Sequence, residues 1–213
     1  RTYRYYEGKA LYPFGFGLSY TDFVYENAAY ADGKSLLIDL NTYASVSVNT
    51  AMQPSVLYAM PTKGQRVTLS GTGSLTGDMD LWKSQQGTLV ANVPLDYTGT
   101  TYISEGTLEV NGEIKGDVNL RARGTLSGKA IVNAISFEGA LNYEGCRLMP
   151  TEQMTFKQGL KLDRKVYIEM DITTAEGNQR ADLIKVEGDL GLSAPAIFTI
   201  VPAENDVQPG KFK

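Results

Sequence analysis

The chain has 213 residues and a net charge of −4, with 22 glycines, one tryptophan, one cysteine and no histidine. Without histidine it cannot build a Ser-His-Asp relay or a His-ligated zinc site, and the single Cys146 excludes an intrachain disulfide, so no cofactor is expected. The charges are scattered and no apolar stretch approaches the roughly 20 residues that span a bilayer, so neither nucleic acid nor a membrane span is expected.

The first predicted segment, residues 1–30, is rich in aromatic side chains. Residues 1–23 read RTYRYYEGKALYPFGFGLSYTDF. This phrase resembles the segment of glycoside hydrolase family 3 enzymes that leaves the second catalytic domain and enters a fibronectin-III-like domain. The resemblance implies a piece of a longer bacterial β-xylosidase or β-glucosidase, whose upstream catalytic domains the aromatic residues contact. The catalytic carboxylates of that family lie upstream of this phrase, so no catalytic residue carries over to this chain.

Residues 31–65 are predicted to form a linker or a β cap. The fibronectin-III strands of the family are not recognisable between Val24 and Gln65. A cap is expected because the open end of a solenoid would expose unpaired strand edges and an apolar interior.

Residues 66–213 show short strands separated by recurring glycines. Alternation of polar and apolar residues, as at 66–69 and 166–170, predicts an all-β protein. The triplet Gly-Thr-Leu begins at residues 87, 106 and 124, at intervals of 19 and 18 residues. A period of roughly 18 to 22 residues is the length of one coil of a parallel β-helix. A β-sandwich is the alternative fold, but it gives no reason for the same triplet to recur.

A second resemblance covers residues 69–213. Residues 87–112, GTLVANVPLDYTGTTYISEGTLEVNG, resemble the passenger-associated repeat of bacterial autotransporters. Residues 180–192, RADLIKVEGDLGL, are similar to the step that closes many such passengers. The resemblance implies a right-handed parallel β-helix of roughly six or seven coils.

Paired carboxylates are the remaining catalytic candidates, since two of them suffice for glycoside hydrolysis. The pairs are Asp78 with Asp80, Glu105 with Glu109, Glu169 with Asp171, and Asp182 with Glu187. Members two residues apart share one face of a strand, a spacing that also suits Ca²⁺, and residues 77–80 are the candidate for such a site. Alternating polar residues are, however, what any solvated β face requires. We therefore assign no catalytic residue and no metal ligand.

Exposed aromatic rings are the second kind of candidate, because sugars stack on them. Trp82 and Tyr97 lie in turn-rich stretches and are the two positions at which a carbohydrate contact is considered. Cys146 is expected to be a buried structural thiol.

Together these features predict a non-catalytic C-terminal accessory or structural module of a bacterial glycoside hydrolase, located outside the cell, in the periplasm or on the cell surface. Its expected partners are the upstream catalytic domains and polysaccharide. One alternative is an adhesin-like or carbohydrate-binding β-helix. Another is a β-helix that itself degrades polysaccharide, which would need carboxylates or basic residues clustered on stacked coils.

Overall fold

The structure, a computed structural model, describes residues 35–38, 44–138, 145–173 and 180–202. Every regular element in these residues is a β-strand, so the prediction of an all-β protein is confirmed. The same residues contain no helix that is long and apolar enough to cross a membrane. The predicted N-terminal segment, residues 1–30, lies outside the described residues.

The strands form sheets in which almost all pairs are parallel. The six-stranded sheet contains β1 (Ser35–Ile38), β3 (Val56–Ala59), β5 (Asp80–Lys83), β7 (Thr101–Ile103), β10 (Val118–Arg121) and β13 (Ile135–Glu138). The nine-stranded sheet contains β2 (Ala44–Ser47), β4 (Arg66–Ser70), β6 (Thr88–Ala91), β8 (Gly106–Val110), β11 (Gly124–Gly128), β14 (Cys146–Pro150), β17 (Val166–Thr173), β18 (Arg180–Ala181) and β21 (Ala196–Pro202). The four-stranded sheet contains β9 (Glu113–Ile114), β12 (Ile131–Val132), β15 (Gln153–Phe156) and β19 (Leu183–Val186), and β16 (Leu160–Leu162) pairs with β20 (Leu190–Leu192).

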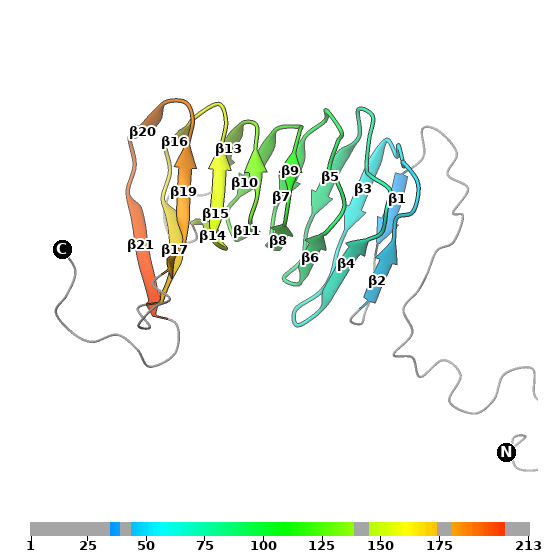
Figure 1. The fold of residues 1–213 in the computed structure, drawn as a ribbon, viewed down its shortest axis with the longest axis horizontal. Helices are drawn as coiled ribbons and strands as arrows, with labels where there is room; N and C mark the ends of the chain where they lie inside the picture. The colour runs from blue at the N-terminus through cyan, green and yellow to red at the C-terminus, as the bar shows by residue number, and fades with distance from the viewer. Residues whose placement is uncertain (1–34, 39–43, 139–144, 174–179, 203–213) are drawn as a thin grey trace, which may run out of the picture.

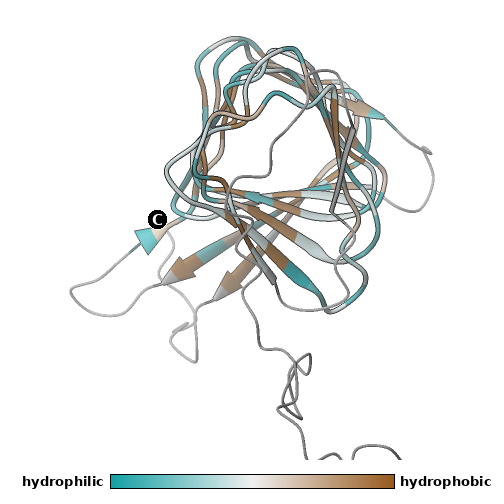
Figure 2. Ribbon diagram, turned by 90° about the vertical axis from the view of Figure 1, so that its right-hand side faces the viewer, coloured by the Kyte–Doolittle hydropathy of each residue, from teal (hydrophilic) through white to brown (hydrophobic). Residues whose placement is uncertain are grey.

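From β1 to β8 the chain alternates between the six-stranded and the nine-stranded sheet, and from β9 on it also passes through the four-stranded sheet. We call each return of the chain to a parallel strand of the nine-stranded sheet a circuit. Most strands pair in parallel with a strand of the next circuit, as β4 does with β6 and β6 with β8. Figure 1 shows the strands of successive circuits side by side, and Figure 2 shows the circuits superimposed around a common interior. β18 is the exception among the described pairs, because it runs antiparallel to the end of β17. Mostly parallel sheets of this kind are compatible with a β-helix.

The Gly-Thr-Leu triplet of the sequence marks the register of the nine-stranded sheet. Thr88, Thr107 and Thr125 are successive register partners, and the leucines that follow them are partners too. The inward column of this sheet consists of Val67, Leu89, Leu108, Leu126, Leu148 and Ile168, each at most 2% exposed. The recurring triplet therefore builds a continuous aliphatic ladder in the core.

The glycine of each triplet allows neighbouring circuits to approach closely at one corner. A Cβ added to Gly87, Gly106 or Gly124 would lie 2.4, 2.3 or 2.4 Å from a backbone carbonyl oxygen of the preceding circuit. At Gly106 the backbone also has a φ of +71°, which disfavours any side chain. Only glycine fits this corner without a shift of the backbone.

The parallel sheets begin before residue 66. β1 pairs in register with β3, and β3 pairs with β5, so these strands belong to the same six-stranded sheet as the later circuits. The sheets thus extend into residues 31–65, the segment for which the sequence predicted a linker or a β cap.

The last circuit leaves apolar side chains uncovered. Leu190 and Leu192 are 58% and 64% exposed, although their register partners Leu160 and Leu162 are buried. Phe198 is 62% exposed and continues the column of Ile168. Among the described residues, nothing packs on this end of the stack.

Candidate functional site

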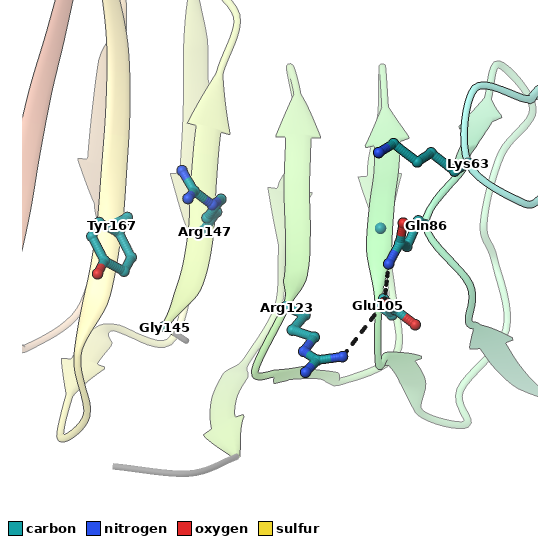
Figure 3. A pocket seen from close by; sticks show the side chains of 8 residues that line it. Lys63, Gln86, Glu105, Arg123, Gly145, Arg147 and Tyr167 are labelled. Atoms are coloured by element: carbon teal, nitrogen blue, oxygen red, sulfur yellow. Dashed lines mark hydrogen bonds and ion pairs between the residues drawn. The ribbon is translucent and has the colours of Figure 1, made fainter. Parts of the chain in front are cut away.

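A groove of about 910 Å³ lies at the corner where the chain leaves the six-stranded sheet and enters the nine-stranded sheet. We call it the corner groove. Its lining residues are Lys63, Gln86, Glu105, Gly106, Arg123, Gly145, Arg147 and Tyr167. They come from successive circuits, and Figure 3 shows their side chains following one another across the strands. The groove therefore runs along the axis of the stack.

The Gly-Thr-Leu triplet also places the side chains of the corner groove. Gln86, Glu105 and Arg123 are the residues directly before the glycines of the three triplets. Because these triplets stack in register, the residues before them lie one above another, about 4.8 Å apart per circuit. Gly106 also belongs to the groove lining.

Glu105 is held from two sides in the middle of the groove (Figure 3). Gln86 Nε2 donates a hydrogen bond of 3.0 Å to Glu105 Oε1, and Arg123 Nη1 lies 3.9 Å from the same oxygen. The Arg123 side chain remains 57% exposed, so its guanidinium is accessible to solvent.

Two cations surround the one aromatic ring of the groove lining. The Arg147 guanidinium carbon and Lys165 Nζ each lie 5.0 Å from the centroid of the Tyr167 ring, which is cation–π distance. Among the described residues, the groove lining carries three cations, Lys63, Arg123 and Arg147, and one carboxylate, Glu105, and Lys165 lies beside it against Tyr167. This corner is thus positive on a chain whose net charge is −4.

A fully buried lysine lies beneath the groove. Lys83 points inward from β5 between its register partners Ala59 and Ile103, and it is 0% exposed. Its Nζ donates to three backbone carbonyl oxygens, those of Ser84 at 3.0 Å, Gln85 at 2.7 Å and Glu105 at 2.8 Å. Burial lowers the pKa of Lys83 to about 8, an effect that the nearby Glu105 charge partly opposes.

Sequence reasoning missed both the corner groove and this lysine. A signal for Lys83 was present, because strand alternation places it on the same face as Leu81, which is a core residue. A signal for the groove was also present, since the residue before each repeated glycine has a polar or charged side chain.

The two predicted carbohydrate contacts lie elsewhere. Trp82 is half-buried on the outer face of β5, where its ring stacks on Tyr102 with centroids 4.1 Å apart and Arg121 lies 5.2 Å from its centroid. Tyr97 is 0% exposed and shares a hydrogen bond of 2.5 Å with the hydroxyl of Thr101. Burial raises the pKa of Tyr97 above its usual range, and its ring has no surface available to a sugar.

Cys146 is a buried free thiol, as expected from the sequence. Its Sγ donates to the carbonyl oxygen of Leu120 at 3.2 Å. Burial raises its pKa to about 11, which disfavours the reactive thiolate at neutral pH.

Several of the predicted carboxylates are engaged in local contacts rather than facing one another. Asp80 Oδ1 accepts from the backbone N–H of Thr100 at 2.7 Å, and Glu109 pairs with Arg66 at 2.8 Å. The two oxygens of Asp182 accept from the backbone N–H groups of Glu152 and Asp171, both at 2.7 Å, and Glu187 pairs with Lys185 at 2.8 Å. Within the described ranges, no three histidine, cysteine or acidic residues come together as a metal-binding group.

Comparison of the chain with protein-family models, with curated proteins and with solved structures gives no match. The resemblances to family 3 glycoside hydrolases and to autotransporter repeats therefore stay predictions.

Proposed function

We propose that this chain is a non-catalytic accessory module whose body is a right-handed parallel β-helix. We further propose that it belongs to a secreted bacterial glycoside hydrolase resembling family 3, with a β-xylosidase or β-glucosidase as the parent enzyme. The role of the module is to hold or shield the catalytic domains of that parent, and the aromatic segment at residues 1–23 is its contact with them.

The observation that carries a scaffold role is the continuity of the core. The inward column of the nine-stranded sheet is at most 2% exposed from Val67 to Ile168. Stacks of this kind gain their stability from packing between neighbouring circuits, and an unbroken column extends that packing along the axis. The regular return of the chain to the same parallel sheets further supports the β-helix.

The arrangement of the acidic side chains supports a non-catalytic role. Glycoside hydrolysis needs two carboxylates that face one bond, about 5 to 10 Å apart. Asp80 is occupied by the Thr100 backbone, and Glu105 and Glu109 have different cationic partners. The corner groove itself is lined by one carboxylate, Glu105, among the described residues.

The test is an activity assay on the purified 213-residue chain with aryl β-xylosides and aryl β-glucosides. We expect no turnover above the uncatalysed rate, with a family 3 enzyme as the positive control. Measurable turnover by the chain alone would refute the non-catalytic role. Sequencing upstream of Arg1 tests the parentage, since the encoded protein either contains family 3 catalytic domains or does not.

A carbohydrate-binding module is the second candidate, and the corner groove favours it more than Trp82 does. One face of the Trp82 ring is covered by Tyr102, and a cation lies close to the same ring. The groove, in contrast, offers exposed charged and amide groups along several circuits.

A further inference from the structure

We propose that the corner groove binds a linear polysaccharide that carries carboxylates, a polyuronate, laid along the axis of the stack. This proposal rests on the groove alone and is independent of the accessory role proposed above. It concerns binding and not cleavage.

The length of the groove favours a polymer over a small anion. Its lining extends from Lys63, between β3 and β4, to Tyr167 in β17, which is five circuits later. At about 4.8 Å per circuit this separation is about 24 Å. A small anion would contact one or two of the cations, whereas an extended chain would reach all of them.

The spacing of the cations favours a ligand with regularly repeated negative charge. Arg123, Arg147 and Lys165 come from three consecutive circuits, as the register of Thr125 with Arg147 and of Arg147 with Tyr167 shows. The guanidinium groups of Arg123 and Arg147 match the planar carboxylate, to which arginine binds through two parallel N–H donors. Successive uronate carboxylates would therefore meet a cation on each of these circuits.

The remaining polar groups suit the hydroxyls of a sugar. The Gln86 amide and the Glu105 carboxylate are hydrogen-bonded to each other in the groove. A carboxylate accepts hydrogen bonds from hydroxyl groups, and an amide both donates and accepts them. A polymer with charge alone would be repelled by Glu105, whereas a uronate chain presents hydroxyls between its carboxylates.

A single-stranded nucleic acid fits this groove less well. Sequence-independent binding of single strands uses aromatic rings on which successive bases stack. The aromatic ring of the groove lining, Tyr167, already has Arg147 and Lys165 against it. The Glu105 carboxylate would also face the phosphates.

Lys83, which lies beneath the groove, cannot act as a base for cleavage of the polymer. This amine has a pKa of about 8, but it is 0% exposed and donates to three backbone carbonyls. A buried amine that is engaged in this way cannot reach a polymer in the groove.

The test is affinity electrophoresis of the full chain in native gels that contain polygalacturonate, alginate, neutral xylan or neutral β-glucan. We expect retardation in the two polyuronate gels and none in the neutral ones. The groove variant Arg123→Gln/Arg147→Gln should raise the apparent Kd by at least about tenfold. The control Lys129→Gln/Lys185→Gln removes the same charge from paired, exposed lysines outside the groove lining, and it should bind as the wild type does.

Equal weakening of polyuronate binding in the groove variant and in the control variant would overturn the proposal, because the loss of affinity would then follow from the change in net charge alone. Absence of retardation in both polyuronates would overturn it too, as would stronger binding to a single-stranded oligonucleotide than to either polyuronate. Shortening of the polyuronate would refute binding without cleavage. None of these results depends on the aryl glycoside assay, so the accessory role and the groove ligand can fail separately. Lys63→Gln provides a second groove variant if the double groove variant unfolds at a lower urea concentration than the wild type.

Discussion

Two leucines in register provide an internal test of the uncovered end of the stack. Leu162 in β16 and Leu192 in β20 are direct partners in neighbouring circuits, yet they are 1% and 64% exposed. Replacing each by alanine removes the same atoms from the same position of the repeat. Only the presence of a further layer of packing differs between the two sites.

The expected costs differ severalfold. Leu162→Ala should lower the free energy of unfolding by about 2 to 5 kcal/mol, since it removes a buried side chain and leaves a cavity. Leu192 keeps only about a third of its surface away from water, so its transfer free energy contributes less than about 1 kcal/mol. No enclosed cavity forms at Leu192, because solvent already reaches the site.

Urea unfolding followed by far-ultraviolet circular dichroism measures both variants against the wild type. The midpoint should fall clearly for Leu162→Ala and hardly at all for Leu192→Ala. Equal losses would refute the reasoning, because they would mean that Leu192 is covered in solution. A loss below about 1 kcal/mol for Leu162→Ala would contradict its place in the core.

Three further predictions concern the corner and the core. Gly106→Ala should lower the free energy of unfolding in urea by several kcal/mol, because the new Cβ would lie 2.3 Å from the Gln85 carbonyl oxygen at a φ of +71°. The control Gly112→Ala, whose Cβ would have no atom within 4 Å, should cost less than about 1 kcal/mol, and similar losses in the two variants would contradict the close approach at Gly106. Because the pKa of Lys83 is lowered, the unfolded state binds a proton that the folded state lacks between pH 8 and 10.5. The free energy of unfolding of the wild type should therefore rise by up to about 3 kcal/mol relative to that of Lys83→Met between pH 7 and pH 10. A difference between the two proteins that does not change with pH would argue against the lowered pKa. Tyr97→Phe should cost about 1 kcal/mol in thermal unfolding, because the buried Thr101 hydroxyl loses its partner, and no change in Tm would count against that bond.

The sequence was most informative where a local pattern and a long-range contact coincide. The Gly-Thr-Leu triplets predicted which residues would meet across circuits, because the same three residues serve the corner, the outer face and the core. The alternation of polar and apolar residues predicted the strands, because successive residues of a strand face the solvent and the core in turn. The start of the sheets was harder to predict, since β2, the first strand of the nine-stranded sheet, lacks that triplet and joins the stack through its pairing with β4.

Individual side chains were less predictable because their environment depends on residues one circuit away. Trp82 and Tyr97 are both aromatic residues in turn-rich sequence, yet one lies half-exposed on the outer face and the other is fully buried. Lys83 is a charged residue in the core, which is possible because three carbonyl oxygens converge where its amine ends. These oxygens belong to residues of two circuits, so the sequence of β5 alone does not show that they meet at the lysine.

Because the glycines hold the corner in place, the side chains that line the groove can be substituted on one circuit at a time. From Gly87 to Gly106, to Gly124 and to Cys146, the residue before the register partner of Thr125, the circuits are 19, 18 and 22 residues long, and the corner stays aligned despite the difference in length. On the circuits that begin at Gly87, Gly106 and Gly124, the residue before the glycine contributes a side chain to the groove lining. A lineage of such chains could change what it binds by single substitutions at these positions, leaving every buried ladder untouched.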